Sequence, residues 1–149
     1  MGNSTSSTDR DAIVEAVNRY AYGLDGRDWK LLDQVFTEDA VARYGGPDGA
    51  LLDGRAAIVA SIRAHLDGCG PTQHLLGNHI VTVEGDEAIA HCKARVYHQG
   101  AGTRAELTPY ECFGVYEDRL KRTPEGWRIA ERHFNVHHQV GDFAILRPA

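Results

Sequence analysis

Hydrophobic residues follow a helical period in the first half of the chain. From Ile13 to Leu24 they recur at steps of three and four residues, as on one face of an amphipathic helix. Gly26 ends this pattern, and Asp28 is a typical N-cap for a second helix. The elements expected here are a helix that ends before Gly26, a short helix that carries Trp29, Leu32, Val35 and Phe36, a strand over residues 40–44, and a helix over residues 55–66.

In the second half the period changes to two, which is typical of half-buried strands. Helices followed by long strands predict an α+β fold, in which a curved, cone-shaped, antiparallel or mixed sheet wraps around the N-terminal helices and leaves a central pocket. We expect a single domain over residues 8–149, after a flexible polar tail over residues 1–7. The expected strands cover residues 73–83, 88–99, 107–121 and 127–137.

Composition narrows the classes of partner. The length of 149 residues fits one domain. A net charge of −5, from 16 Lys and Arg against 21 Asp and Glu, provides no basic stripe for phosphates, so no nucleic-acid partner is expected. Three cysteines without a C-x-x-C pair favour a reducing compartment. No membrane-spanning run or signal-peptide pattern is found, and we expect a cytoplasmic protein with no membrane partner.

Two histidines share predicted apolar strand faces, and one carboxylate directly follows an apolar helix face; these three residues are candidates for chemistry. His98 lies on the small apolar face of the strand that begins at residue 88, and His74 shares a face with Leu76, Asn78 and Ile80. Asp25 ends the first helix, where burial in the pocket would raise its pKa and suit it to act as a base or an orienting group. A core histidine with satisfied hydrogen bonds and a solvated carboxylate are the structural alternatives. Two inward histidines with an inward carboxylate favour proton transfer at neutral pH.

Other chemistries have weaker support. His133, His137 and His138 suggest a metal site, but on a strand His133 and His137 would stand about 13 Å apart, too far to share one ion. No phosphate loop, nucleophile elbow or nucleotide fingerprint is present, and no cationic group can be placed beside a cysteine. The sequence therefore predicts no metal and no cofactor.

Four short segments resemble one known family. They are Tyr20-x-x-x-Leu24-Asp25-Gly26-x-Asp28-Trp29, Gln73-His74-x-x-Gly77-Asn78, Arg95-Val96-x-His98-Gln99 and Gly126-Trp127-Arg128-Ile129. In this order they are similar to the SnoaL-like group of the nuclear-transport-factor-two-like superfamily, which includes scytalone dehydratases and bile-acid 7α-dehydratases. The resemblance implies the cone-shaped fold. It is less specific for chemistry, because this fold hosts cyclases, isomerases, hydrolases and non-enzymes.

The resemblance also implies roles for individual residues. The family's catalytic pair falls on Asp25 and His74, with Asp25 orienting His74 as the base. His98 matches a second histidine, which would protonate a departing hydroxyl, and Tyr44 matches a tyrosine that polarises a substrate carbonyl through water. Substrate contacts are expected from Tyr20, Asn78, Tyr110 and Cys112, of which Tyr110 and Cys112 replace a polar Ser and Asn pair of scytalone dehydratase.

These residues lead to three functional hypotheses. The first is a cofactor-free dehydratase that eliminates water from a small cyclic or aromatic hydroxy-carbonyl substrate. The second is an isomerase or polyketide cyclase that uses the same pair, and the third is a module that binds a small hydrophobic molecule without turnover. A homodimer or homotrimer is implied by the resemblance, through a convex sheet face that carries Arg95, Tyr97, Phe113 and Val115.

Overall fold

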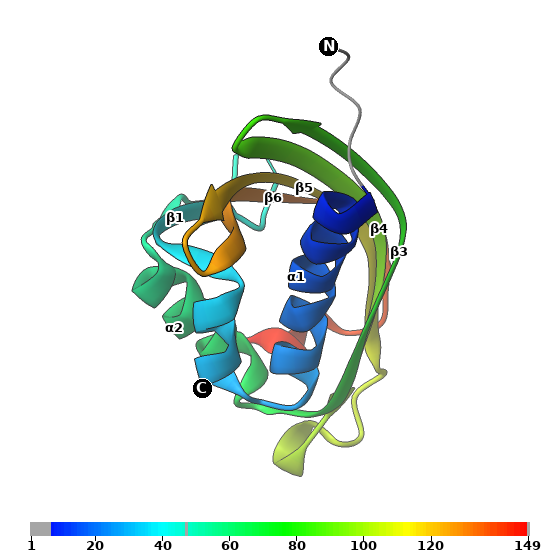
Figure 1. The fold of residues 1–149 in the computed structure, drawn as a ribbon. Coiled ribbons are helices and arrows are strands. Elements are labelled where there is room, and N and C mark those ends of the chain that lie inside the picture. The colour runs from blue at the N-terminus through cyan, green and yellow to red at the C-terminus, as the bar shows by residue number, and fades with distance from the viewer. Residues whose placement is uncertain (1–6, 47, 149) are drawn as a thin grey trace.

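A curved sheet wraps around the first helix in the computed structural model, which describes residues 7–46 and 48–148 (Figure 1). The strands and helices follow the order expected from the sequence, with helices first and the long strands after them. The elements are α1 (Ser7–Asp25), the 3-10 helix η1 (Trp29–Gln34), β1 (Phe36–Arg43), β2 (Leu52–Asp53), α2 (Arg55–Leu66), β3 (Cys69–Glu84), β4 (Glu87–Gly100), η2 (Gly102–Arg104), β5 (Tyr110–Thr123), β6 (Gly126–Val140) and η3 (Phe143–Leu146).

The sheet is mixed and open. Its strands lie in the order β2-β1-β6-β5-β4-β3. Antiparallel ladders join β3 to β4, β4 to β5 and β5 to β6, whereas β1 runs parallel to β6. The expected α+β class and cone-shaped sheet are therefore confirmed.

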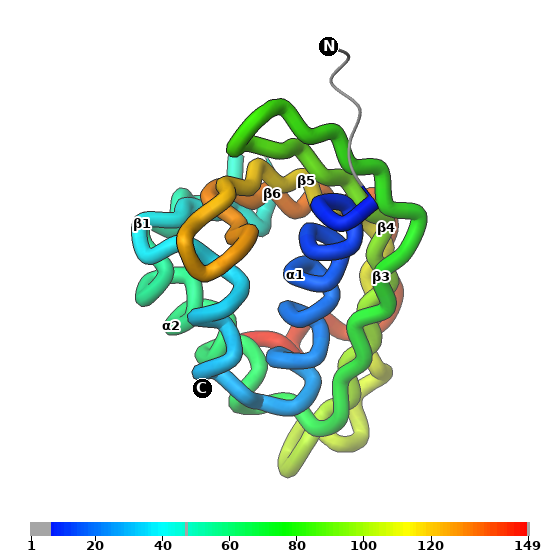
Figure 2. Tube along the Cα trace, in the orientation of Figure 1, coloured from blue at the N-terminus to red at the C-terminus, as the bar shows by residue number. Residues whose placement is uncertain are grey.

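Helix α1 lies inside the curve of the sheet (Figure 2). Its apolar stripe is buried. Ile13, Val17, Tyr20 and Leu24 are all buried, which confirms the three- and four-residue spacing. Each large apolar side chain buried in this way contributes about 1.5–3 kcal/mol to the free energy of unfolding. This packing fixes the end of α1 against β3.

Helix α1 starts one residue earlier than expected. Ser7 already belongs to the helix, and the rest of the polar tail predicted over residues 1–7 lies outside the described residues. No helix in the described part of the chain is long and apolar enough to cross a membrane.

The segment after α1 departs from the prediction. Asp28 caps η1 through a hydrogen bond to the backbone amide of Leu31, as expected, but this helix ends at Gln34. Phe36, expected on the helix, opens β1 and pairs with Ile129 of β6. The reason is tertiary, because that partner strand lies more than ninety residues away in the sequence.

A bulge in β3 overturns the face assigned to Asn78. The ladder with β4 shifts register between Gly77 and Ile80, and Asn78 adopts a left-handed backbone with φ 56°. As a result, the inward positions change from His74 and Leu76 to odd-numbered residues, and Ile80 is 70% exposed. Asn78 and Ile80 therefore do not share the inward face of His74.

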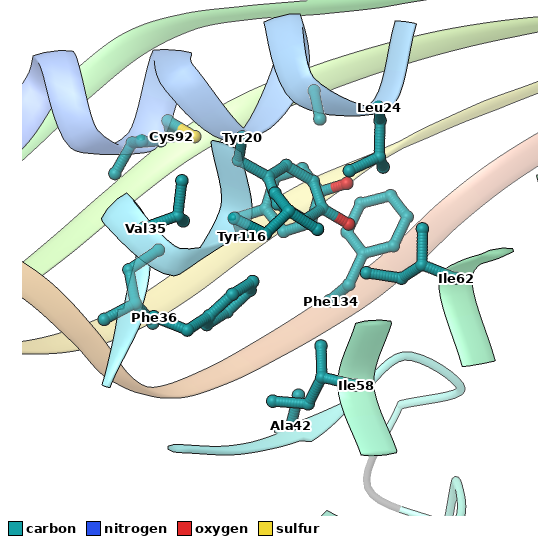
Figure 3. Packing of buried hydrophobic residues seen from close by; sticks show 14 of the residues in the cluster. Tyr20, Leu24, Val35, Phe36, Ala42, Ile58, Ile62, Cys92, Tyr116 and Phe134 are labelled. Carbon is teal, nitrogen blue, oxygen red and sulfur yellow. The ribbon is translucent and has the colours of Figure 1, made fainter. Parts of the chain in front are cut away.

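A buried ion pair of Arg132 and Asp118 lies in the core beside Tyr20 of α1. Arg132 of β6 donates two hydrogen bonds of 2.7 Å to the carboxylate of Asp118 on β5, and neither residue is accessible to solvent to more than 3%. The guanidinium carbon of Arg132 lies 4.3 Å from the ring centre of Tyr20 and 4.1 Å from that of Tyr116. Figure 3 shows these two rings beside Phe134 in the core.

The outward face of the sheet carries the residues expected to form an association surface. Arg95 of β4 pairs with Phe113 of β5, and its guanidinium carbon lies 5.1 Å from the centre of that ring. Arg95 also donates a 3.0 Å hydrogen bond to Glu111. Tyr97 and Val115 alternate with buried residues on the same strands. Association through this face stays a prediction.

Candidate active site

The end of α1 forms a tight turn that presents Asp25 to β3. The amide of Arg27 donates to the carbonyl of Leu24, and the amide of Asp28 donates to the carbonyl of Gly23. These two bonds form the Schellman motif, in which the residue after the cap takes a left-handed conformation. Arg27 occupies this position, with φ 55°. Asp25 is the last helical residue, at the end where the helix dipole disfavours negative charge.

Three donors from β3 compensate the charge of Asp25. Oδ1 accepts hydrogen bonds from Nδ1 of His74 at 2.7 Å and from the hydroxyl of Thr72 at 2.9 Å. Oδ2 accepts one from the backbone amide of His74 at 2.8 Å. The contact between Asp25 and His74 falls in the range of about 2.6–3.2 Å that a working acid–base pair requires. The side chain of His74 is 5% exposed and that of Asp25 is 25% exposed.

The charge state of Asp25 differs from the expectation. Burial alone would raise the pKa of its carboxyl, but the hydrogen bonds from His74 and Thr72 outweigh burial and lower the pKa below its usual value. Asp25 is therefore ionised at neutral pH. An ionised carboxylate with a low pKa is an orienting group rather than a base, and it makes Nδ1 of His74 the protonated ring nitrogen.

His98 occupies the next strand, with its ring centre 6.1 Å from that of His74. Its Nδ1 lies 3.0 Å from the backbone carbonyl oxygen of Tyr110, which can only accept, so Nδ1 carries the proton. Burial lowers the pKa of His98 to about 4, and the hydrogen bond to Tyr110 only partly opposes this. His98 is therefore neutral at pH 7 and a poor proton donor, contrary to the role expected from the sequence.

Two tyrosines form a pair on the opposite side. The hydroxyl of Tyr20 donates a 3.0 Å hydrogen bond to the hydroxyl of Tyr44, which follows β1 directly. Burial raises the pKa of Tyr20 and of Tyr44 well above the usual value. Both side chains therefore stay protonated, and Tyr44 keeps a hydroxyl proton to donate.

These groups line one cavity of about 370 Å³ between the concave face of the sheet and the helices. This volume is in the range of small-molecule sites. Asp25 stands behind His74 and is not part of the wall, and Asn78 lies on a separate outer groove beside Lys93. The bulge in β3 is the reason for that displacement of Asn78. The expected site residues on the cavity wall are Tyr20, Tyr44, His74, His98, Tyr110 and Cys112.

Comparison with known proteins agrees with this architecture. The family model of the SnoaL-like domain matches residues 5–133. The chain belongs to the SnoaL-like family. The uncharacterized protein Rv2910c of Mycobacterium tuberculosis strain H37Rv is 34% identical to this SnoaL-like protein over 126 residues, which are 84% of this chain and 83% of the relative.

Two solved structures from Novosphingobium aromaticivorans share the fold. A proposed aromatic ring hydroxylase has a TM-score of 0.86 and 26% identity, covering 97% of this chain and 100% of its own. A proposed scytalone dehydratase has a TM-score of 0.80 and 21% identity, covering 91% of this chain and 88% of its own. These two structures are named for different activities although they share one fold, so function depends on the residues of the site and not on the fold alone.

The cavity of this SnoaL-like protein also contains a third histidine, which the sequence analysis did not single out. Nδ1 of His65 lies 2.8 Å from the carbonyl oxygen of Ser61, one turn earlier on α2. The helical spacing could have indicated this position, because His65 follows Ile58 and Ile62 on the same face of α2. Phe143 of η3, 48% exposed, lies at the same cavity, but nothing in its local pattern indicated this.

The two residues expected to differ from scytalone dehydratase are both neutral. The hydroxyl of Tyr110 donates a 2.7 Å hydrogen bond to Oε1 of Gln139, and burial raises the pKa of Tyr110 to about 12. Burial also raises the pKa of the Cys112 thiol to about 11, so Cys112 is not a thiolate nucleophile.

The histidines of β6 do not join this site. Nε2 of His133 lies 3.0 Å from Oε1 of Glu131, and His137 and His138 are exposed. Across residues 7–46 and 48–148, no three side chains of His, Cys, Asp or Glu come together as metal ligands.

Proposed function

We propose that this SnoaL-like protein is an acid–base lyase, a dehydratase that eliminates water from a small cyclic hydroxy-carbonyl compound without a cofactor. The observation that carries the proposal is the 2.7 Å contact between Asp25 and His74, with His74 on the wall of a cavity that also holds His98 and Tyr44. Because Asp25 holds the proton of His74 on Nδ1, Nε2 keeps its lone pair for the substrate.

In the proposed reaction, Nε2 of His74 takes a proton from the carbon beside the substrate carbonyl. The electron pair of that C–H bond forms an enolate, and the carbonyl of the substrate is the electron sink. The resulting imidazolium is stabilised by Asp25. The enolate then expels the β-hydroxyl as the C–O bond breaks, and the proton on His74 passes to the departing oxygen to form water.

His98 and Tyr44 have binding roles in this scheme. Neutral His98 accepts a hydrogen bond from the substrate hydroxyl through Nε2 and holds it beside His74. Tyr44, itself hydrogen-bonded by Tyr20, donates to the oxygen where negative charge develops, directly or through water. In this proposal, His74 therefore acts as base and then as acid, and the expected proton transfer from His98 is not needed.

An isomerase or cyclase is the second candidate. The neutrality of His98 favours it, because a neutral His98 has no acidic proton for a leaving group. The same enolate would be reprotonated at another carbon or attack an internal carbonyl. A module that binds without turnover is the third reading.

Incubation with a panel of cyclic β-hydroxy ketones in D₂O separates these readings. Proton NMR should show loss of water to an α,β-unsaturated ketone with the wild type, and none with Asp25→Asn. Deuterium exchange or double-bond migration without loss of water would favour the isomerase. Ligand shifts with neither change would contradict both enzymatic readings.

A further inference from the structure

We propose that Arg27 and Thr72 are positioning residues, which hold the carboxylate of Asp25 and through it the imidazole of His74 in one orientation. The hydrogen-bond arrangement stands on the structure alone. Its catalytic consequence rests on the function proposed above.

The direction of the hydrogen bonds follows from donor chemistry. Nη1 of Arg27 donates to Oγ1 of Thr72 at 2.9 Å, and a guanidinium can never accept. The single proton of the Thr72 hydroxyl is therefore committed to Oδ1 of Asp25, at 2.9 Å. Arg27 therefore donates to Thr72 and Thr72 donates to Asp25, which also accepts from Nδ1 of His74; these partners allow no other directions.

The unusual backbone conformation of Arg27 indicates that its side chain has a structural role. The left-handed position after a helix is where glycine is favoured, yet this chain has an arginine there, with φ 55°. Its guanidinium also donates to the carbonyls of Leu24 and Gly70, both at 2.8 Å. Arg27 thereby joins the end of α1 to the start of β3, the two elements that carry Asp25 and His74.

Thr72 limits the rotation of the carboxylate. With its hydroxyl in place, Oδ1 has two donors and Oδ2 has one, all from β3. Without the hydroxyl, Oδ1 would keep only the imidazole of His74. The charged or titratable groups around Asp25 are Arg27, His74 and His98, so Thr72 acts there as a neutral, directional donor.

The test compares Thr72→Val, which keeps the shape and removes the hydroxyl, with Thr72→Ser, which keeps the hydroxyl. Thr82→Val, at an exposed position of the same strand, is the matched control. One readout is the deshielded Nδ1 proton of His74 in ¹⁵N-labelled protein, assigned by its loss in Asp25→Asn. The other is the titration of the Asp25 carboxyl carbon by ¹³C NMR. Neither readout needs a substrate.

We expect Thr72→Val to move the Nδ1 proton signal upfield and to shift the Asp25 titration to higher pH, because a hydrogen bond to the ionised carboxylate is lost. Thr72→Ser should restore both, and Thr82→Val should change neither. With a substrate in hand, Thr72→Val should lower kcat by up to about a hundredfold with little change in KM. The proposal is overturned if Thr72→Val matches the wild type in both spectra, or if serine does not rescue.

A second variant covers the case in which Thr72→Val does not fold. Arg27→Gly suits the left-handed turn, so its thermal midpoint should stay close to that of the wild type while both spectral readouts move. Arg10→Met is its control, because Arg10 also joins α1 to a β3 carbonyl, that of His79. If Asp25→Asn left the His74 signal in place, the proposed function would fail. The Asp25 titration would still decide the role of Thr72.

Discussion

Nδ1 of His98 lies 3.0 Å from the carbonyl oxygen of Tyr110, its partner across the β4–β5 ladder. This one contact fixes the proton on Nδ1 and leaves Nε2 as the acceptor. The carboxylate of Asp25 does the same for His74 on β3. Two histidines from neighbouring strands are thus held as neighbouring acceptors in one cavity, and their chemistry follows from the groups behind them.

The buried His98 makes stability depend on pH. Burial lowers its pKa to about 4 in the folded protein, against about 6.5 unfolded, so the unfolded chain binds more protons between these values. Proton uptake by His98 in the unfolded chain therefore lowers the free energy of unfolding by about 3 kcal/mol as the pH falls from 6.5 towards 4, and this loss is absent above pH 6.5. Urea unfolding at pH 7.5 and 4.5 should show a smaller loss for His98→Asn than for the wild type. Equal losses would contradict a low pKa for His98.

Replacing Asp25 by Asn should abolish the proton transfer while the fold remains. The amide presents a donor to Nδ1 of His74 and favours the wrong tautomer, so kcat on a substrate found in the panel should fall about 10³–10⁴-fold. Asp28→Asn is the matched control, because asparagine caps a helix as well as aspartate does. A loss of similar size in both variants would point to a general disturbance of the turn.

Tyr20 and Tyr44 should be energetically coupled. Tyr44→Phe removes the acceptor for the buried hydroxyl of Tyr20, and the free energy of unfolding should fall by about 1–2 kcal/mol. The double variant with Phe at both positions should lose less than the sum of the single variants. Denaturant unfolding of the wild type, the two single variants and the double variant gives a double-mutant cycle. Tyr97→Phe on the outward face is the control. Strict additivity would show that the two hydroxyls do not interact.

Removing only one partner of the ion pair between Arg132 and Asp118 should lower the free energy of unfolding more than removing both. Arg132→Met leaves a buried, uncompensated carboxylate, for which about 3–5 kcal/mol of unfolding free energy is typically lost. Arg132→Met combined with Asp118→Leu should recover much of that loss. Chemical denaturation measures both. A double variant less stable than Arg132→Met would mean that Asp118 has other favourable contacts.

Asn78 should behave as a turn residue rather than a ligand contact. In the left-handed region, at φ 56°, a Cβ atom is unfavourable unless the side chain can hydrogen-bond locally, as asparagine can. Asn78→Ala should therefore lower the free energy of unfolding by about 1 kcal/mol. Asn78→Gly should be at least as stable as Asn78→Ala in the same urea series. The opposite order would show that a side chain at this position matters more than the backbone conformation.

The local patterns of the sequence were enough for much of the fold. In β4, alternation alone correctly placed Ala90, Cys92 and His98 on the buried face, because side chains of a regular strand alternate strictly. The spacing of apolar residues likewise predicted the buried stripe of α1. Resemblance to the SnoaL-like group singled out Asp25 and His74, which the fold brings to 2.7 Å.

Partners distant in the sequence decided the rest. Bulges reversed the alternation at Asn78 in β3 and before Arg132 in β6, and a period of two cannot indicate a bulge whose cause is the neighbouring strand. The hydrogen bonds from His74 and Thr72 keep Asp25 ionised. Burial keeps His98 neutral, and the carbonyl of Tyr110 places the proton of His98 on Nδ1. No spacing rule links these groups. The sequence by itself thus determined most of the elements, the inward faces of α1 and β4, and the candidate residues. Only the tertiary structure decided their charge states and hydrogen-bond directions, because these depend on burial and on contacts between strands.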